Sequence, residues 1–111
     1  MSDFRVYLGG EGEVSDALNQ QPAWAVEPTW RTSQPPARDL AECVRAGLRV
    51  LLCPNDDIAL PDECADEVMT NSVPVDISMW LGVGISSGEI KRILKRGGAW
   101  WHNGRLEFRK P

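Results

Sequence analysis

The segment of residues 87–98, SGEIKRILKRGG, constrains the fold of this 111-residue chain more than any other stretch. Ser86, followed three residues later by Glu89, has the spacing of a capping box, which begins a helix. The glycine pair of residues 97–98 supplies a left-handed stop, and the segment therefore predicts one amphipathic helix that ends there. Apolar residues recur at helical spacing on one face and basic residues fill the other, solvated face: Ile90, Ile93, Leu94 and Lys91, Arg92, Lys95, Arg96.

Four short segments have the composition of β-strands. Residues 48–53 (LRVLLC) form a continuous apolar run, which is typical of a parallel strand buried on both faces. Residues 4–8 (FRVYL), 66–71 (DEVMTN) and 99–101 (AWW) predict further strands. Strands joined by helical crossovers imply a doubly wound, mostly parallel sheet, in which ligands bind at the carboxyl ends of the strands.

The carboxy-terminal segment predicts an antiparallel pair of strands. The dipeptide Asn103-Gly104, the strongest short hairpin signal, separates residues 99–102 from residues 105–109. Because side chains alternate along a strand, Leu106 and Phe108 are expected to face the core, with the charged residues between them in water.

The amino-terminal half has a weaker pattern. Residues 14–20 have room for two helical turns at most, so the first crossover is expected to be short or a loop. Residues 23–26 are the candidate second strand, residues 28–37 carry three prolines and predict an irregular connection, and residues 38–46 predict a helix. The length is that of one domain, spanning residues 1–111.

Two of these segments together resemble the second half of a class I S-adenosylmethionine-dependent methyltransferase domain. Residues 57–71 (DIALPDECADEVMTN) are similar to the family's acidic residue and "LPFPDNSFDVVISN" run. Residues 89–98 (EIKRILKRGG) are similar to its "EIKRVLKPGG" run, and the match covers about residues 48–101. The resemblance implies a small, truncated α/β fold of the Rossmann-like type, in which the family's usual ending has shrunk to a C-terminal antiparallel hairpin.

The resemblance also implies where S-adenosylmethionine binds. Asp57 and Ile58 match positions that flank the adenine, and Glu27 matches an acidic residue that accepts hydrogen bonds from the ribose. Asn71 begins a loop that faces the methyl-donor pocket, and it is the candidate for orienting a nucleophile. A degenerate glycine-rich turn follows the first strand, and its cofactor-binding candidates are Gly9, Gly10, Glu11 and Gly12. The alternatives are a tight strand-to-loop turn with solvated glutamates, and an ordinary loop carboxylate at Glu27.

Two functions remain open. The first is an enzyme that binds S-adenosylmethionine and transfers its methyl group to a small-molecule or protein acceptor, a reaction that needs chiefly proximity and alignment. The second is a catalytically inactive methyltransferase-like module, for binding or as a toxin-type effector, that acts through protein association. The degenerate glycine turn and the missing substrate-binding insertions favour this second function.

The amino-acid composition indicates which classes of partner the protein binds. The net charge of −4 argues against unassisted binding of nucleic acid. Five tryptophans are more than a small core holds, so Trp80, Trp100 and Trp101 predict a homodimer or a partner protein.

The remaining reactive residues give no chemical motif. The three cysteines, at positions 43, 53 and 64, are odd in number and lack metal-ligand spacing, which predicts reduced thiols in a cytoplasmic protein with no metal site. The single histidine, His102, lies beside the hairpin turn and is expected to be exposed and structural. There is no run of apolar residues long enough for a membrane span.

Overall fold

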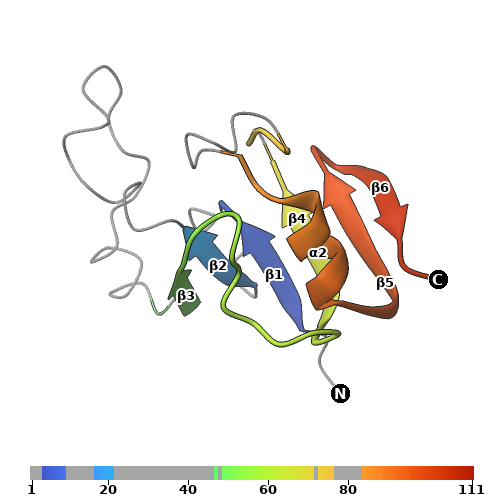
Figure 1. Ribbon diagram of the computed structural model, residues 1–111, viewed down its shortest axis with the longest axis horizontal. Coiled ribbons are helices and arrows are strands. Elements are labelled where there is room, and N and C mark those ends of the chain that lie inside the picture. The colour runs from blue at the N-terminus through green and yellow to red at the C-terminus, as the bar shows by residue number, and fades with distance from the viewer. Residues whose placement is uncertain (1–3, 10–16, 22–46, 48, 72, 77–83) are drawn as a thin grey trace.

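The chain forms a six-stranded sheet with one helix in the computed structural model, which describes residues 4–9, 17–21, 47, 49–71, 73–76 and 84–111 (Figure 1). The elements are β1 (Arg5–Leu8), β2 (Leu18–Gln21), β3 (Arg49–Leu52), β4 (Ala65–Thr70), α2 (Ser87–Ile93), β5 (Leu94–His102) and β6 (Arg105–Arg109). The strand order is β3-β2-β1-β4-β5-β6. The first five strands are parallel and β6 is antiparallel to β5, so the mostly parallel α/β sheet and its C-terminal hairpin are confirmed.

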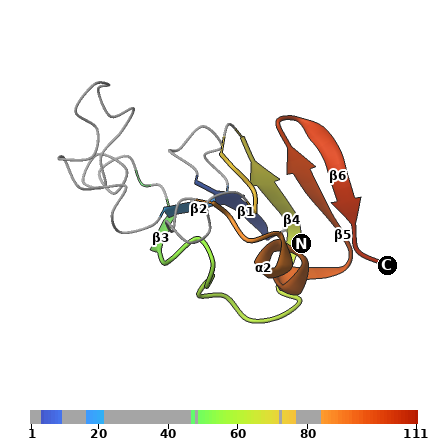
Figure 2. The ribbon, with the colours of Figure 1, turned by 45° about the horizontal axis from the view of Figure 1, so that its top comes forward.

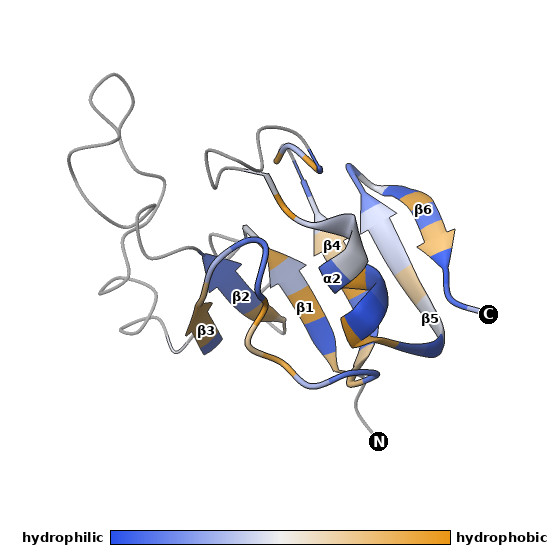
Figure 3. Ribbon diagram, in the orientation of Figure 1, coloured by the Kyte–Doolittle hydropathy of each residue, from blue (hydrophilic) through white to orange (hydrophobic). Residues whose placement is uncertain are grey.

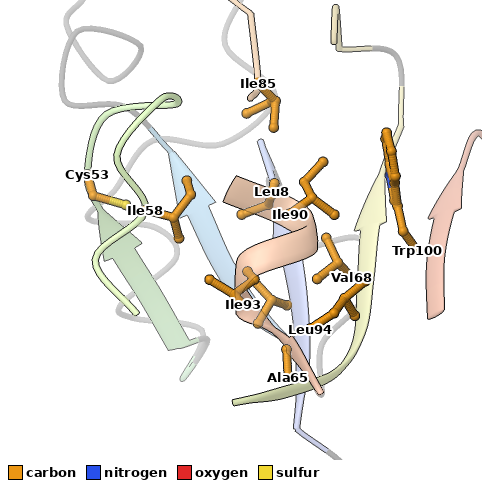
Figure 4. Packing of buried hydrophobic residues seen from close by; sticks show 11 residues of the cluster. Leu8, Cys53, Ile58, Ala65, Val68, Ile85, Ile90, Ile93, Leu94 and Trp100 are labelled. Carbon is orange, nitrogen blue, oxygen red and sulfur yellow. The ribbon is translucent and has the colours of Figure 1, made fainter. Parts of the chain in front are cut away.

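One face of the sheet carries the hydrophobic core. Helix α2 belongs to the connection from β4 to β5 and lies against this face. The connection from β3 to β4, residues 53–64, runs beside the helix without forming a helix itself (Figure 2). The side chains of α2, this connection and the inner strands point into the space between them, as Figure 4 shows. The buried cluster is made of Val6, Leu8, Cys53, Ile58, Ala65, Val68, Ile85, Ile90, Ile93, Leu94 and Trp100.

Strand β2 was not predicted from the sequence. Residues 14–20 were expected to hold at most two helical turns, but Leu18–Gln21 is a strand that pairs in parallel with β1 and β3. The strand is hydrophilic over most of its length (Figure 3), yet its last three residues are buried. Their amides form hydrogen bonds, including Asn19 Nδ2 to Arg49 O (3.3 Å), which satisfies polar groups that burial would otherwise leave unpaired. The candidate strand at residues 23–26 and the candidate helix at residues 38–46 lie outside the described residues.

Strand β3 is also less buried than its apolar sequence predicts. It is the outermost strand on its side of the sheet, and Leu52 is 41% exposed. The prediction of a strand is confirmed, and the prediction of burial on both faces is wrong: none of its four residues is fully buried, and among the described strands β3 pairs with β2 alone.

Helix α2 ends four residues before the glycine pair that was predicted to stop it. Leu94 caps the helix in an extended conformation, and residues 95–98 already belong to β5. The carbonyls of residues 91–94 all find partners from outside the helix. Lys110 Nζ donates to the first and last of them (both 2.8 Å), and the backbone N–H groups of Glu63 and Cys64 donate to the two between (2.9 and 2.8 Å). These tertiary hydrogen bonds satisfy the C-terminal carbonyls that a longer helix would have used internally.

The helix N-terminus forms half of the predicted capping box. Ser86 Oγ accepts a hydrogen bond from the backbone N–H of Glu89 (3.2 Å). The return bond is absent, because the Ser86 N–H donates to Asn55 O (3.1 Å) and the Glu89 carboxylate accepts from the N–H of Ile58 (2.8 Å). Both changes connect α2 to the β3–β4 connection.

Arg92 was predicted on a solvated basic face, and this prediction is wrong. Its guanidinium uses all five N–H donors, toward Glu89 and the β3–β4 connection. Nε donates to Glu89 Oε2 (2.8 Å), one terminal nitrogen to Leu60 O and Asp62 Oδ1 (both 2.8 Å), and the other to Ile58 O (2.8 Å) and Glu89 Oε1 (3.0 Å). These bonds to Glu89 and Asp62 raise the pKa of Arg92 above its ordinary value. Arg92 therefore fastens a connection that has no helix of its own.

The C-terminal hairpin has the predicted turn. Asn103 (φ 51°) and Gly104 (φ 81°) both have positive φ, as a type I′ turn requires. Phe108 packs against the core, but Leu106 is 48% exposed, so its predicted core position is wrong. The register shifts by one residue between Trp100, which pairs with Phe108, and Trp101, which pairs with Leu106. This β-bulge turns Leu106 to the opposite face of the sheet.

The tryptophans bear on the expected homodimer. Trp100 is 5% exposed and belongs to the core, so it does not supply the surface that the sequence argument assumed. Trp101 is half-buried on the other face, and Trp80 lies outside the described residues. The homodimer stays a prediction.

Replacing Arg92 by Lys should lower the free energy of unfolding by about 2–4 kcal/mol, because Lys cannot reproduce the planar fork and leaves buried carbonyls unpaired. Urea unfolding followed by tryptophan fluorescence measures this. Arg96→Lys is the matched control: Arg96 is exposed and lies 3.8 Å from Glu63, so its loss should be about 0.5 kcal/mol or less. Equal losses for the two variants would contradict the role given to Arg92.

Stability should fall in acid partly through Glu89. The hydrogen bonds from Arg92, then the N–H of Ile58, hold the pKa of this carboxyl below its ordinary value of 4.5. The unfolded chain therefore takes up this proton first, so the stabilisation is complete above pH 4.5 and is lost as the pH falls through the lower folded value. The free energy of unfolding of Glu89→Gln should depend less steeply on pH below 4.5 than that of the wild type, and parallel curves would refute the assignment.

Candidate functional site

The order of the parallel strands reverses between β1 and β4, whose carboxyl ends lie side by side (Figure 1). Strands on one side continue through β2 to β3, and on the other through β5. In open parallel sheets this switch point is where ligands bind, because the connections leave it in opposite directions and open a crevice. Gly9 follows β1 there, and Asn71 follows β4.

Gly9 is required at the switch point for two reasons. It has a φ of +73°, and a Cβ built on it would lie 2.8 Å from Val73 Cγ1. The loop after β4 therefore packs directly on the backbone of the turn after β1. The close approach that the resemblance assigns to a ligand is made here by a side chain of the protein itself.

The buried side chain of Gln20 connects the ends of three strands. Its Oε1 accepts from the N–H of Gly9 (3.0 Å), and its Nε2 donates to Cys53 O (2.9 Å) and Asn55 Oδ1 (3.1 Å). Gln20 is fully buried, so these bonds form away from water and fix the turn after β1 relative to the connection after β3. One amide therefore connects the turn after β1 to the connection after β3 at the carboxyl edge of the sheet.

Asn71 lies at the switch point, exposed to solvent. Its Nδ2 donates to the hydroxyl of Tyr7 (2.8 Å), a buried residue of β1. The bond holds the Asn71 amide in one orientation, so that its oxygen can position a polar group of a ligand.

Asp57 and Ile58 are neighbours in sequence but have different environments in the structure. The Asp57 side chain is exposed in the β3–β4 connection, while Ile58 is 2% exposed and belongs to the core (Figure 4). The backbone N–H and C=O of Ile58 are also taken, by Glu89 and Arg92. Of the two positions that the resemblance places beside the adenine, Asp57 has a side chain available to a ligand. The other candidates, Gly10, Glu11, Gly12 and Glu27, lie outside the described residues.

A hydrogen-bonded group at the ends of β4 and β5 was missed by the sequence analysis. Thr70 is fully buried, and its Oγ1 accepts from Trp100 Nε1 (2.9 Å) and lies 2.7 Å from His102 Nδ1. His102 was expected to be exposed and structural, but it is half-buried and in hydrogen-bond contact with Thr70. Thr70 and His102 lie side by side because the register of β4 and β5 pairs them. The pattern of a single sequence does not predict this register.

A groove of about 530 Å³ lies on the α2 face of the sheet, beside this group. We call it the β5 groove. It is lined by Val73, Pro74, Val75, Asp76, Ser87, Lys91, Trp100, His102 and Glu107. Its volume falls within the range of small-molecule sites, about 300–1,000 Å³.

The described thiols are poor nucleophiles. Burial, ahead of the hydrogen bonds and charges nearby, raises the pKa of both Cys53 and Cys64, so both stay protonated at neutral pH. Within the described ranges, no three His, Cys, Asp or Glu side chains are grouped to hold a metal ion. The helix that the structure describes is too short and too polar to cross a membrane.

Comparisons of this chain with protein-family models, curated proteins and solved structures give no match.

Replacing Gly9 by Ala should lower the free energy of unfolding by about 2–4 kcal/mol, from the positive φ and from the contact with Val73. Gly104→Ala is the control, since Gly104 also has a positive φ (+81°) but a Cβ there meets nothing within 4 Å. That variant should lose about 1–2 kcal/mol. Thermal or urea unfolding measures both.

Adding Val73→Ala to Gly9→Ala tests the contact itself. The second substitution removes the atom that a Cβ on Gly9 would meet, so the double variant should be more stable than the sum of the two single losses predicts. Strict additivity would mean that Val73 does not limit the turn.

Proposed function

We propose that this protein binds S-adenosylmethionine at the carboxyl edge of β1 and β4 and is a methyltransferase-like domain of the Rossmann-like type. The observation that carries the proposal is the reversal of the parallel strand order between β1 and β4. The order 3-2-1-4-5-6 is that of doubly wound sheets that bind nucleosides and dinucleotides at this point. The antiparallel last strand agrees with the ending that the sequence resemblance implies.

The segments that carry the resemblance lie where such a site needs them. Residues 57–71 form the connection into β4 and the strand itself, and end at the switch point. Residues 89–98 cover the core beneath it, through α2 and the start of β5. Asp57, exposed in that connection, offers a carboxylate that can accept hydrogen bonds from a nucleoside hydroxyl or amine.

Methyl transfer from a sulfonium requires that the acceptor approach in line with the breaking bond, so positioning supplies most of the acceleration. Asn71, held by Tyr7, is the described residue at the switch point that can orient an acceptor.

A second function, a methyltransferase-like module that binds a partner without catalysis, is favoured by two observations. The space beside Gly9 is filled by Val73, and Ile58 is in the core, so neither contributes its expected contact to a nucleoside. The two functions differ in whether the cofactor binds at all.

Isothermal titration calorimetry with S-adenosylmethionine and S-adenosylhomocysteine tests the proposal. Wild-type protein should bind, and Asp57→Ala should weaken binding by about 1.5–3 kcal/mol, because it removes a charge-assisted hydrogen bond. Asp56→Ala is the matched control, an exposed carboxylate in the same connection, and should bind as the wild type does. Neither variant should change the melting temperature appreciably, since both side chains are exposed.

The outcomes separate the functions. A wild-type protein that gives no heat with either form of the cofactor leaves the non-catalytic module. Binding that survives Asp57→Ala and fails in Glu27→Ala would place the nucleoside against residues outside the described ranges.

A further inference from the structure

The β5 groove brings together polar groups from three elements. Ser87 and Lys91 come from one face of α2, His102 from the end of β5, and Glu107 from the bulge of β6. Its end is formed by residues 73–76, where both carboxylate oxygens of Asp76 accept hydrogen bonds from Ser87. The Asp76 carboxylate is thus already used within the protein.

The contact between Thr70 and His102 indicates which ring nitrogen of the neutral imidazole carries the proton. The indole of Trp100 can only donate, so Thr70 Oγ1 accepts that bond and its single hydroxyl hydrogen needs an acceptor. His102 Nδ1, at 2.7 Å, is the ring nitrogen placed to accept it, and the tautomer sets the direction of this bond. An accepting Nδ1 leaves the proton of the neutral imidazole on Nε2. Asn103 Nδ2 lies 3.4 Å from Nε2 and could donate to it only in the opposite tautomer, but this contact is longer and weaker than the one with Thr70.

Two residues of opposite charge line the same groove as this imidazole. Lys91 Nζ lies 4.8 Å from the centre of the Phe108 ring, a cation–π contact that holds the ammonium at the groove. Glu107, on β6, also lines the groove. Among the described residues neither Lys91 nor Glu107 forms an ion pair, although the Lys91 ammonium helps to hold the pKa of Asp76, in the same lining, below its ordinary value after the hydrogen bonds from Ser87. An anion alone would be repelled by Glu107, and a cation alone by Lys91.

We propose that the β5 groove binds a small zwitterion, whose carboxylate accepts hydrogen bonds from His102 Nε2–H and Lys91 and whose ammonium faces Glu107. The groove shares Val73 with the switch point, but the charged residues of this site lie on α2 and β6, and the inference does not rest on binding of S-adenosylmethionine.

Nuclear magnetic resonance of the intact chain tests the geometry, because His102 is the only histidine and its imidazole signals need no assignment. Long-range proton–nitrogen spectra at a pH where the ring is neutral should show Nε2 protonated and Nδ1 unprotonated. Thr70→Ser should keep this pattern, and Thr70→Val should lose it. A ring protonated on Nδ1 in the wild type and in Thr70→Ser overturns the inference even if Thr70→Val fails to fold.

Binding is tested with defined probes rather than with the cofactor, whose methionine end is itself a zwitterion. Glycine and 4-aminobutyrate, which differ in the separation of their charges, are titrated against the His102 signals, with acetate and methylammonium as single-charge controls. At least one zwitterion should saturate with an affinity about ten-fold or more above either control, the gain expected when a second charged group is paired.

Substitutions of Lys91 and Glu107 test which charged group of the zwitterion each residue binds. Lys91→Gln should weaken the zwitterion about ten-fold, and Glu107→Gln should remove its advantage over acetate. Arg96→Gln removes a positive charge from an exposed residue that does not line the groove, and should change nothing. The inference is overturned if none of the probes perturbs His102, or if Lys91→Gln and Arg96→Gln behave alike. Loss of cofactor binding in Asp57→Ala with unchanged zwitterion binding would leave this inference standing, so the two proposals fail separately.

Discussion

The five hydrogen bonds of Arg92 hold the described core together. A parallel sheet needs a cover on each buried face, and crossover helices usually provide it. Here the crossover between β3 and β4 has no helix, and among the described residues the one helix, α2, covers the face beside it. The guanidinium of Arg92 satisfies two carbonyls of this crossover and binds Asp62, while Glu89 of the same helix takes the N–H of Ile58. Charge-assisted bonds thus do here what packing of a second helix would do elsewhere.

The parts of the fold that were predicted are those with a local signal. Three strands, β1, β3 and β4, and the Asn103-Gly104 turn could be predicted from their own residues. The period of apolar side chains and the chemistry of a turn depend only on residues that are neighbours in sequence. Strand β2 has no such signal, because its amides are buried through bonds to residues distant in sequence. The end of α2 is likewise set by Lys110 and by the backbone after Glu63, whose approach depends on the finished sheet.

In the candidate site too, residues with a local sequence signal were predicted, and residues that meet only in the folded sheet were not. The resemblance leads to Gly9, Asp57 and Asn71, all at or near the edge where the strand order reverses. It does not distinguish Asp57, which is exposed, from its buried neighbour Ile58, because which of two adjacent side chains enters the core depends on the path of the connection. Thr70 and His102 carry no sequence signal of a site, since they meet only through the register of two strands.

The connection of residues 53–64 has few hydrogen bonds of its own, and its protection from solvent comes from contacts with α2. It should therefore open when α2 opens, as one cooperative unit, whereas the β5–β6 hairpin keeps its own ladder of hydrogen bonds. Amide exchange would then report one opening free energy for Ile58, Leu60 and the helix together. Asp57 lies within this unit, so a ligand held by its carboxylate would slow the exchange of the whole unit while leaving that of the hairpin unchanged.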